Sequence, residues 1–445
     1  MKVLFLLALV VLVVVNGLPV SVNQRKTYHG YKIYRLSLDT QQQLDYLVSM
    51  NDALQRNEMT EEVEFLTDTS LLSPDFKTPI SVMVSPGQEA AFLKAMKAEA
   101  IRNEVALADL EKYLEEERYI SPEDQRTVDN SGMTWTAYHR YETIERYVQT
   151  LAANYPDLVT LTTLGKSYEG RNLYLLKIGK PRADGAVKPA VWMDSQIHAR
   201  EWIAAATVTY MVNKMVTGYA TDATSRRMLD QIDWYVLPVI NVDGYEYTHT
   251  NQRLWRKTRR VNPFSQYIGA DPNRNYDHKW MVRGADQNPS SEIYAGAYPL
   301  SEFENVLVTD AVLQHKSQIK TLLTFHSAAE MWLLPWGYDS SVPDDFEDLR
   351  QMGLRATAAL KALYGVSYRV GSSTQLLGAA AGATDDWGKS KGMIKYSATV
   401  ELRDQGYGFT LPPSQIIASG EETFAAINVV AQIVYDEYGP TLPSN

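Results

Sequence analysis

Two histidines and a glutamate stand directly after apolar stretches of the chain. His198 and Glu201 belong to the run His198-Ala199-Arg200-Glu201-Trp202, and His326 follows a second apolar stretch. Imidazole nitrogens and a carboxylate oxygen are good zinc ligands, and a catalytic zinc site commonly takes three protein ligands plus a water. His198 and Glu201 could converge on one ion across a turn, with His326 as a distant third ligand. By itself this spacing is a weak signal, because a lone histidine that ends a strand is more often structural.

The elements around these residues predict how they could meet. Strands are predicted over residues 188–197, 234–242, 319–325 and 394–402, and helices over 202–216 and 302–314. Apolar strands between helices indicate an α/β fold, with a mixed, mostly parallel twisted sheet flanked by helices. Active sites in open α/β sheets form at the carboxyl ends of strands. Glu401 lies close to the end of the last strand, so we expect it near His198 and His326.

The N-terminus has the pattern of a secretory signal. Lys2 precedes the apolar run 3–15, which is followed by Asn16 and Gly17. This order is typical of a signal peptide, and the run is shorter than the roughly 20 apolar residues that a membrane span needs. We therefore expect residues 1–17 to be a signal peptide and the protein to be secreted and extracellular.

Residues 18–126 are predicted to form a separate small module. Strands at 32–38 and 80–84, each followed by a helical pattern, fit a small α+β domain. Residues 98–118 are rich in Ala, Leu, Glu and Lys, which predicts one connecting helix.

The segment that follows the predicted connecting helix loses all periodicity and collects polar residues. It spans 119–132 and reads as an exposed linker, the kind of segment at which proteases cut chains. We expect a trypsin-like protease to cut after Arg126, with Arg118 as a second candidate. A plain interdomain linker is the alternative. Residues 127–445 would then form the large catalytic domain.

Composition narrows the classes of partner. The chain has 43 Lys and Arg against 53 Asp and Glu, a formal net charge of -10. A protein that neutralises phosphates needs a basic face, so no nucleic-acid partner is expected, and no basic run indicates a membrane surface. The absence of cysteine excludes a thiol as nucleophile or metal ligand. We expect a monomer.

Five motifs occur in order along the chain: His198-Ala199-Arg200-Glu201-Trp202, Leu254-Trp255-Arg256-Lys257-Thr258, Asp271-Pro272-Asn273-Arg274-Asn275, Phe325-His326-Ser327 and Glu401-Leu402-Arg403-Asp404. In this order they resemble the carboxypeptidase A/B family of zinc metallocarboxypeptidases. The resemblance extends from about Tyr138 to the C-terminus, and residues 26–118 resemble the inhibitory pro-domain that precedes these enzymes.

The resemblance implies one zinc ion per chain, held by His198, Glu201 and His326. Asp271 would orient a ligand histidine, a usual requirement of such sites. Glu401 would be the general base that takes a proton from the attacking water and later passes it to the leaving amine.

The same resemblance implies a second catalytic residue, Arg256, and three residues that bind the substrate. Arg256 would stabilise the oxyanion that develops on the scissile carbonyl. Asn273 and Arg274 would hold the terminal carboxylate of a peptide or protein, and Arg200 would add positive charge nearby. A clamp on that carboxylate would make the enzyme an exopeptidase.

Alignment of residues 371–387 with the family puts Asp385 at the base of the specificity pocket. In the carboxypeptidase B branch an aspartate there accepts C-terminal Lys or Arg, whereas the A branch has an apolar residue. A buried carboxylate selects a cation because either charge left unpaired is unfavourable. The alternative is that Asp385 and Asp386 cap a helix.

Two positions depart from the family pattern. Gly378 stands where the family usually has a tyrosine that closes over substrate, and Ala328 stands where it usually has a tyrosine beside a neighbouring subsite. Two hypotheses remain open. The first is the zymogen of a digestive carboxypeptidase with a B-like preference, and the second is a pseudoenzyme that binds peptide C-termini without cleaving them. No G-x-S-x-G run indicates a serine hydrolase.

Overall fold

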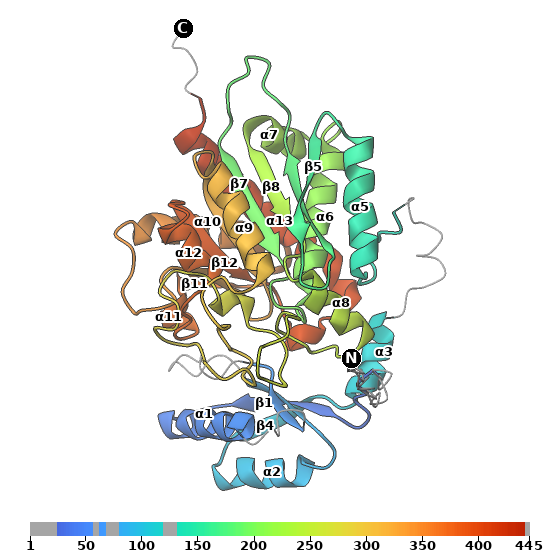
Figure 1. The fold of residues 1–445 in the computed structure, drawn as a ribbon, viewed down its shortest axis with the longest axis vertical. Helices are drawn as coiled ribbons and strands as arrows, with labels where there is room; N and C mark the ends of the chain where they lie inside the picture. Colours follow the sequence, from blue (N-terminus) through green and yellow to red (C-terminus); the bar gives the residue numbers. More distant parts are fainter. Residues whose placement is uncertain (1–24, 57–61, 68–79, 119–130, 441–445) are drawn as a thin grey trace, which may run out of the picture.

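The structure, a computed structural model, describes residues 25–56, 62–67, 80–118 and 131–440, which form a small domain and a large one. Figure 1 shows the small domain (blue) packed against one end of the large domain. The predicted boundaries at residues 17 and 126 lie outside the described residues and remain predictions.

The small domain is built on a four-stranded sheet. Its elements are β1 (Lys32–Ser37), α1 (Gln41–Arg56), β2 (Val63–Phe65), β3 (Ile80–Val84), α2 (Glu89–Ala98), β4 (Arg102–Leu107) and α3 (Leu110–Arg118), with the strand order β2-β3-β1-β4. Tyr34 and Leu36 of β1 are buried against apolar side chains of α1 and α2, among them Leu47 and Phe92. The alternation in this strand therefore reflects one face packed on helices.

The single connecting helix predicted for residues 98–118 is wrong in its first half. Ala100 has a φ of 52°, in the left-handed region, so the helix cannot continue through it. Residues 102–107 form β4, which pairs antiparallel with β1, and only Leu110–Arg118 is helical. Local propensity favoured a helix, but the edge of β1 offers backbone hydrogen bonds that propensity does not foresee.

The large domain is built on an eight-stranded mixed sheet. Its strands are β5 (Val159–Lys166), β6 (Asn172–Ile178), β7 (Ala190–Ser195), β8 (Asp233–Leu237), β9 (Ile319–His326), β10 (Met331–Leu334), β11 (Arg369–Ser372) and β12 (Tyr396–Glu401). The order is β11-β10-β12-β9-β7-β8-β6-β5, and the central strands β12, β9, β7 and β8 are parallel. The predicted fold class is confirmed. The strand predicted through residue 242 ends at Leu237 because Pro238 has no N–H to donate to the ladder.

Helices cover both faces of this sheet. They are α5 (Tyr141–Asn154), α6 (Trp202–Gly218), α7 (Ala223–Gln231), α8 (Val242–Thr250), α9 (Phe303–His315), α10 (Phe346–Tyr364), α11 (Ser373–Leu376), α12 (Thr384–Ser390) and α13 (Ile416–Tyr438). Helices α6, α7, α10 and α13 contact one another in one layer, while α9 lies in front of the sheet in Figure 1. Every residue of β7 is buried, as expected for a strand covered on both faces.

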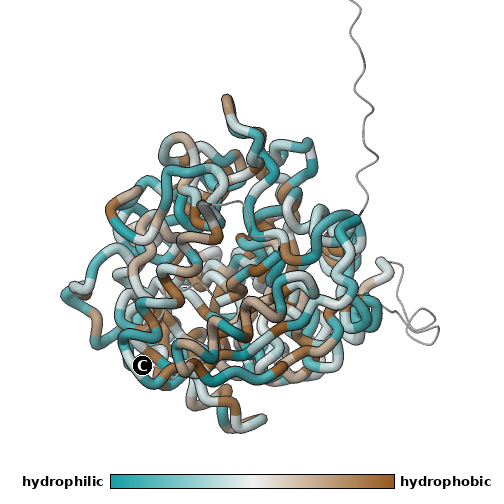
Figure 2. Tube along the Cα trace, turned by 90° about the horizontal axis from the view of Figure 1, so that it is seen from below, coloured by the Kyte–Doolittle hydropathy of each residue, from teal (hydrophilic) through white to brown (hydrophobic). Residues whose placement is uncertain are grey.

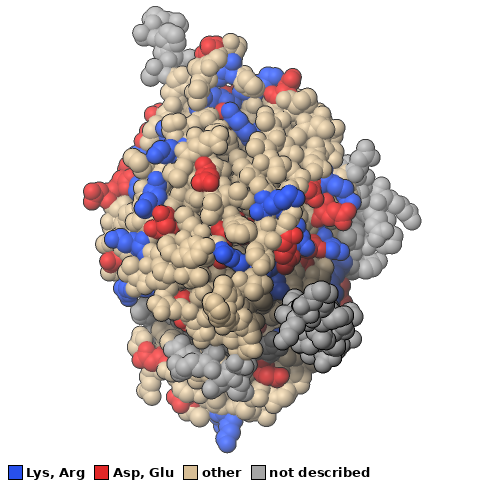
Figure 3. Space-filling view, viewed as in Figure 1, with Lys and Arg blue, Asp and Glu red and all other residues tan. Residues whose placement is uncertain are grey.

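The surface is mixed in polarity and charge. In Figure 2, hydrophilic and hydrophobic residues alternate along the segments nearest the viewer, as they do in amphipathic elements. Lys and Arg are interspersed with Asp and Glu on the face drawn in Figure 3. Among the described residues, no helix combines the length and the apolar character required to cross a membrane.

Candidate metal centre and substrate cavity

The three predicted metal ligands lie together at the carboxyl edge of the parallel strands. His198 follows β7, Glu201 immediately precedes α6, and His326 is the last residue of β9. Nδ1 of His198 lies 2.7 Å from Oε1 of Glu201 and 3.1 Å from Nδ1 of His326. Oε2 of Glu201 lies 3.1 Å from Nδ1 of His326. Within the described part of the chain, this is the one group of three such side chains whose ligand atoms could share an ion.

The distances and charges of this cluster fit zinc. Ligand bonds of about 2.0–2.1 Å in a tetrahedral site place ligand atoms about 3.3 Å apart, close to what is observed. All three side chains are buried, and burial disfavours their charged forms. The two imidazoles nevertheless hold the pKa of Glu201 below its usual value, and Glu201 raises the pKa of His326 to about 9. The cluster is therefore stabilised by an added positive charge, which a metal ion supplies.

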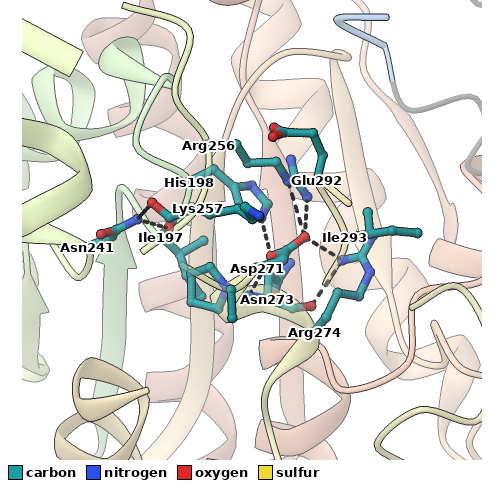
Figure 4. Close-up of polar contacts among 12 residues, drawn as sticks. Ile197, His198, Asn241, Arg256, Lys257, Asp271, Asn273, Arg274, Glu292 and Ile293 are labelled. Atoms are coloured by element: carbon teal, nitrogen blue, oxygen red, sulfur yellow. Dashed lines mark hydrogen bonds and ion pairs between the residues drawn. The ribbon is translucent and has the colours of Figure 1, made fainter. Parts of the chain in front are cut away.

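Asp271 fixes the orientation of the first histidine. It immediately precedes the short 3₁₀ helix Pro272–Arg274, and Nε2 of His198 donates to its Oδ1 at 3.1 Å, which leaves Nδ1 for the metal. Arg256 donates from Nε and Nη2 to Oδ2 of the same carboxylate, at 3.2 and 2.8 Å. Figure 4 shows Asp271 between these partners, with Arg274 also alongside. Burial alone would raise the pKa of Asp271, but Arg256 and His198 hold it well below its usual value.

A cavity of about 590 Å³ opens in front of the metal cluster. Glu401 lines it and is the last residue of β12, paired in register with His326 on β9. Burial raises the pKa of Glu401 to about 7. At neutral pH a carboxyl group with such a pKa can both accept and return a proton. Arg256 lines the same cavity, so an acid–base group and a cation both face its interior.

Asn273 and Arg274 line the cavity next to Arg256. The side-chain oxygen of Asn273 accepts from the backbone N–H and the hydroxyl of Thr384, both at 2.9 Å, so its NH₂ group is the part left for a ligand. Arg274 is held by hydrogen bonds to the carbonyl oxygens of Asn273 and Gly284. A Cβ at Gly382 would lie 2.4 Å from the carbonyl oxygen of Arg274, so this close approach requires glycine.

Asp385 belongs to the lining of the same cavity. The lining also contains several residues with short side chains, among them Gly337, Ser373, Ala380, Ala383 and Thr399. Asp385 is 2% exposed, and among the described residues no Lys or Arg forms an ion pair with it. It does not cap α12, since Ala383 is the residue before the helix and makes no side-chain capping bond. The neighbouring Asp386 instead accepts from the backbone N–H groups of Gly337 and Tyr338.

The small domain closes one side of the cavity. Four of its residues, Arg35, Leu66, Thr67 and Ser81, belong to the lining. Oε1 of Glu64 on β2 lies 3.0 Å from Nη1 of Arg200, which is itself part of the lining. The Arg200 guanidinium also stacks 4.3 Å from the ring of Phe409. The Glu64 carboxylate of the small domain thus pairs with the Arg200 guanidinium, which is the group predicted to add positive charge at the substrate site.

A second ion pair joins the domains behind this contact. Nε and Nη2 of Arg253 donate to the carboxylate of Glu117 on α3, at 2.7 and 2.8 Å, and both side chains are fully buried. Arg253 also donates to the carbonyl oxygen of Arg200 at 2.8 Å. Removing one partner of such a pair while the domains stay together would leave an uncompensated buried charge, so Glu117 and Arg253 depend on each other at this interface.

Sequence reasoning did not find every residue of this site. Nothing in the local sequence marks Glu64, Glu117 or Ser373 as part of a site. A glutamate in a strand, a glutamate in a helix and a Ser-Ser-Thr run are all common. The departures Gly378 and Ala328 both line the cavity. Arg126 lies outside the described residues, and Arg118 is the last residue of α3, so the cut site stays a prediction.

The large domain has a mixed sheet with a His-Glu-His cluster at the carboxyl ends of its strands. This cluster faces a cavity that is lined by an acid–base group and several arginines. Together these features define a zinc peptidase. Comparison with family models matches residues 144–426 to the zinc carboxypeptidase family and residues 34–117 to the carboxypeptidase activation peptide. The chain belongs to the zinc carboxypeptidase family and carries an activation peptide, so the family assignment made from the motifs is confirmed.

Named relatives and solved structures agree with this assignment. The chain is 49% identical over 308 residues to "Carboxypeptidase B" of Astacus astacus, covering 69% of this chain and all of the relative. It is 37% identical to "Carboxypeptidase B" of Rattus norvegicus, covering 92% of this chain and 94% of the relative. The structure of thrombin activatable fibrinolysis inhibitor matches with a TM-score of 0.81 at 30% identity, covering 91% of this chain and 98% of that one.

Proposed function

We propose that this protein is the secreted zymogen of a digestive metallocarboxypeptidase that removes C-terminal Lys and Arg. The observation that carries the preference is the buried carboxylate of Asp385, which lines the cavity without a cationic partner among the described residues. A cationic side chain of the substrate would supply that partner. The relatives named carboxypeptidase B support the same preference. In digestion, trypsin-like cuts produce peptides that end in Lys or Arg, which are the substrates such an enzyme would consume.

His198, Glu201 and His326 would hold the zinc ion. When bound, zinc lowers the pKa of a water molecule to about 7 and polarises the scissile carbonyl. Glu401 takes a proton from the attacking water and then gives it to the leaving amine nitrogen. Arg256 stabilises the negative charge that develops on the carbonyl oxygen. Asp271 supports both steps, because it orients His198 and holds the Arg256 guanidinium.

Asn273 and Arg274 bind the terminal carboxylate of the substrate, and Asp385 binds its side chain. These contacts place the last peptide bond, and no internal one, between Glu401 and the metal ligands. Since the phenol groups usual at positions 328 and 378 are absent, substrate is held by charge and by the pocket walls instead. Arg200 adds positive charge once Glu64 has left.

The zymogen proposal rests on the small domain, which lines the cavity and pairs Glu64 with Arg200. We expect the full-length chain to be inactive, and trypsin treatment with a cut after Arg126 to produce activity. The domains would accordingly be residues 1–17, 18–126 and 127–445, with the signal removed on secretion and the mature enzyme a monomer.

A panel of peptides that differ only in their last residue tests the proposal before and after trypsin. The cut enzyme should carry one zinc per chain and release terminal Lys and Arg faster than terminal Phe. An active precursor would refute inhibition by the small domain. Zinc binding without release of any residue would favour the pseudoenzyme, which the missing tyrosines at 328 and 378 motivate.

Release of the cut pro-domain should depend on pH. Burial raises the pKa of Glu64 from 4.5 to about 7, against the opposing effect of Arg200, and burial also raises the pKa of Glu117. Carboxyl groups with raised pKa values take up protons when the domains associate, so association is strongest below about pH 5 and weakens as pH rises through 7. We expect the dissociation constant of the cut pro-domain to rise at least about tenfold between pH 5 and pH 8.

Fluorescence or surface-binding measurements on trypsin-cut protein would measure this dependence. The Glu64→Gln variant should show a flatter pH profile, because the group that takes up the proton is gone. Glu115→Gln, an exposed glutamate on the same helix as Glu117, is the matched control and should leave the profile unchanged. Tighter association at pH 8 than at pH 5 would contradict the prediction.

A further inference from the structure

Among the described residues, two other residues donate to the carboxylate of Asp385. The Oγ of Ser373 lies 3.1 Å from its Oδ2, and the backbone N–H of Asp386 lies 3.0 Å from its Oδ1. The second donor belongs to the main chain, so Ser373 is the one side chain that can fix the direction of this carboxylate. Both Ser373 and Asp385 line the cavity.

The fold places Ser373 independently of Asp385. Ser373 is the first residue of α11, directly after β11, and Oγ of Ser372 accepts from the N–H of Gln375 to cap that short helix. The Ser373 hydroxyl also lies 3.2 Å from the carbonyl oxygen of Leu334, the last residue of β10. One proton therefore has two acceptors, and the charged carboxylate is the stronger of them.

The two adjacent acids have different surroundings. Asp386 is engaged by the backbone N–H groups of Gly337 and Tyr338 and does not belong to the cavity lining. Of the two acids, only Asp385 belongs to the cavity lining. A substrate side chain in the cavity could therefore meet the Asp385 carboxylate and not that of Asp386.

We propose that Ser373 is a positioning residue for substrate selection: its hydroxyl holds Oδ2 of Asp385 so that the carboxylate meets a cationic C-terminal side chain. The inference rests on the proposed preference for Lys and Arg and extends it to a residue that acts through Asp385. Burial raises the pKa of Asp385, and the Ser373 hydrogen bond acts in the opposite direction, which supports the same role because it favours the ionised form.

The test compares substrates that share an acyl group and end in arginine, in citrulline, which is neutral and of nearly equal shape, or in phenylalanine. We expect Ser373→Ala to lower kcat/KM for the arginine substrate about tenfold, mainly through KM, since a hydrogen bond to a charged group has about this strength. The citrulline and phenylalanine substrates should change by less than about twofold. Ser373→Thr, which keeps the hydroxyl, should restore kcat/KM for the arginine substrate.

A double-mutant cycle with Asp385→Asn completes the test. In that background Ser373→Ala should produce no further loss on arginine, because the carboxylate it positions is gone. Equal losses on all three substrates, no loss on arginine, or additive losses in the double variant would overturn the role of Ser373. If the unmodified enzyme has the same kcat/KM for the arginine and citrulline substrates, the proposed preference for Lys and Arg is wrong, and so is the proposed role of Ser373. If the ratio of arginine to citrulline kcat/KM in Ser373→Ala equals that of the unmodified enzyme, the role of Ser373 alone is overturned.

Discussion

We expect Glu401→Gln to lower kcat by about 10⁴-fold in the trypsin-activated enzyme, while zinc content stays at one per chain and KM changes little. The amide cannot accept a proton from the attacking water, and so the same variant also loses the donor for the leaving amine. The position is decisive: Glu401 ends β12 in register with His326 on β9, with burial raising its pKa to about 7. Steady-state kinetics and metal analysis on the same preparation measure both quantities.

Glu330→Gln is the matched control for this result. Glu330 also lines the cavity, and burial also raises its pKa, but it bonds to Gln405 and is not paired in register with a ligand strand. We expect its kcat to stay within about threefold of the unmodified enzyme, since its carboxylate reaches no reacting atom. If Glu401→Gln retains more than a tenth of the activity, the base is a different group and the proposed mechanism fails.

Asp385→Asn removes the charge of the specificity pocket while preserving its size. We expect kcat/KM for substrates that end in Lys or Arg to fall by about 10²-fold to 10³-fold, because a cation left unpaired in a buried site costs roughly 3–4 kcal/mol. Substrates that end in Phe or Leu should lose little, so the order of preference reverses. The ratio of kcat/KM for arginine and phenylalanine substrates measures the effect.

Asp386→Asn provides the comparison for this reversal. Asp386 accepts three hydrogen bonds from the backbone N–H groups of Gly337 and Tyr338, so its replacement should lower the melting temperature. It should leave the ratio of arginine to phenylalanine activity nearly unchanged. If Asp386→Asn reverses the preference, or if Asp385→Asn does not, the charge that selects the substrate is not that of Asp385.

Much of the site could be predicted without coordinates. His198, Glu201, His326 and Glu401 each follow or end a predicted strand, and parallel strands bring their carboxyl ends to one edge of a sheet. The structure brings these four side chains together at that edge. The same pattern of apolar strands between helices predicted the mixed sheet correctly, because strands covered on both faces must be apolar along their whole length.

Local patterns failed where a distant partner decides the outcome. Residues 102–107 have helical propensity but form β4, since the free edge of β1 supplies hydrogen bonds to its backbone. Glu64 and Glu117 each pair with an arginine 136 positions further along the chain, and neither has a periodicity that reveals its partner. Such contacts depend on how two domains pack.

The chain's own residues and their order thus determined the family and predicted the metal ligands and the general base, since these follow from strand ends and five ordered motifs. Only the tertiary structure decided that Asp385 faces the cavity while Asp386 is engaged by the backbone, and that Ser373 holds Asp385. The two acids are adjacent and chemically identical, so the sequence cannot separate them. The path of the backbone at 337–338 and the turn from β11 into α11 give each acid a different set of donors.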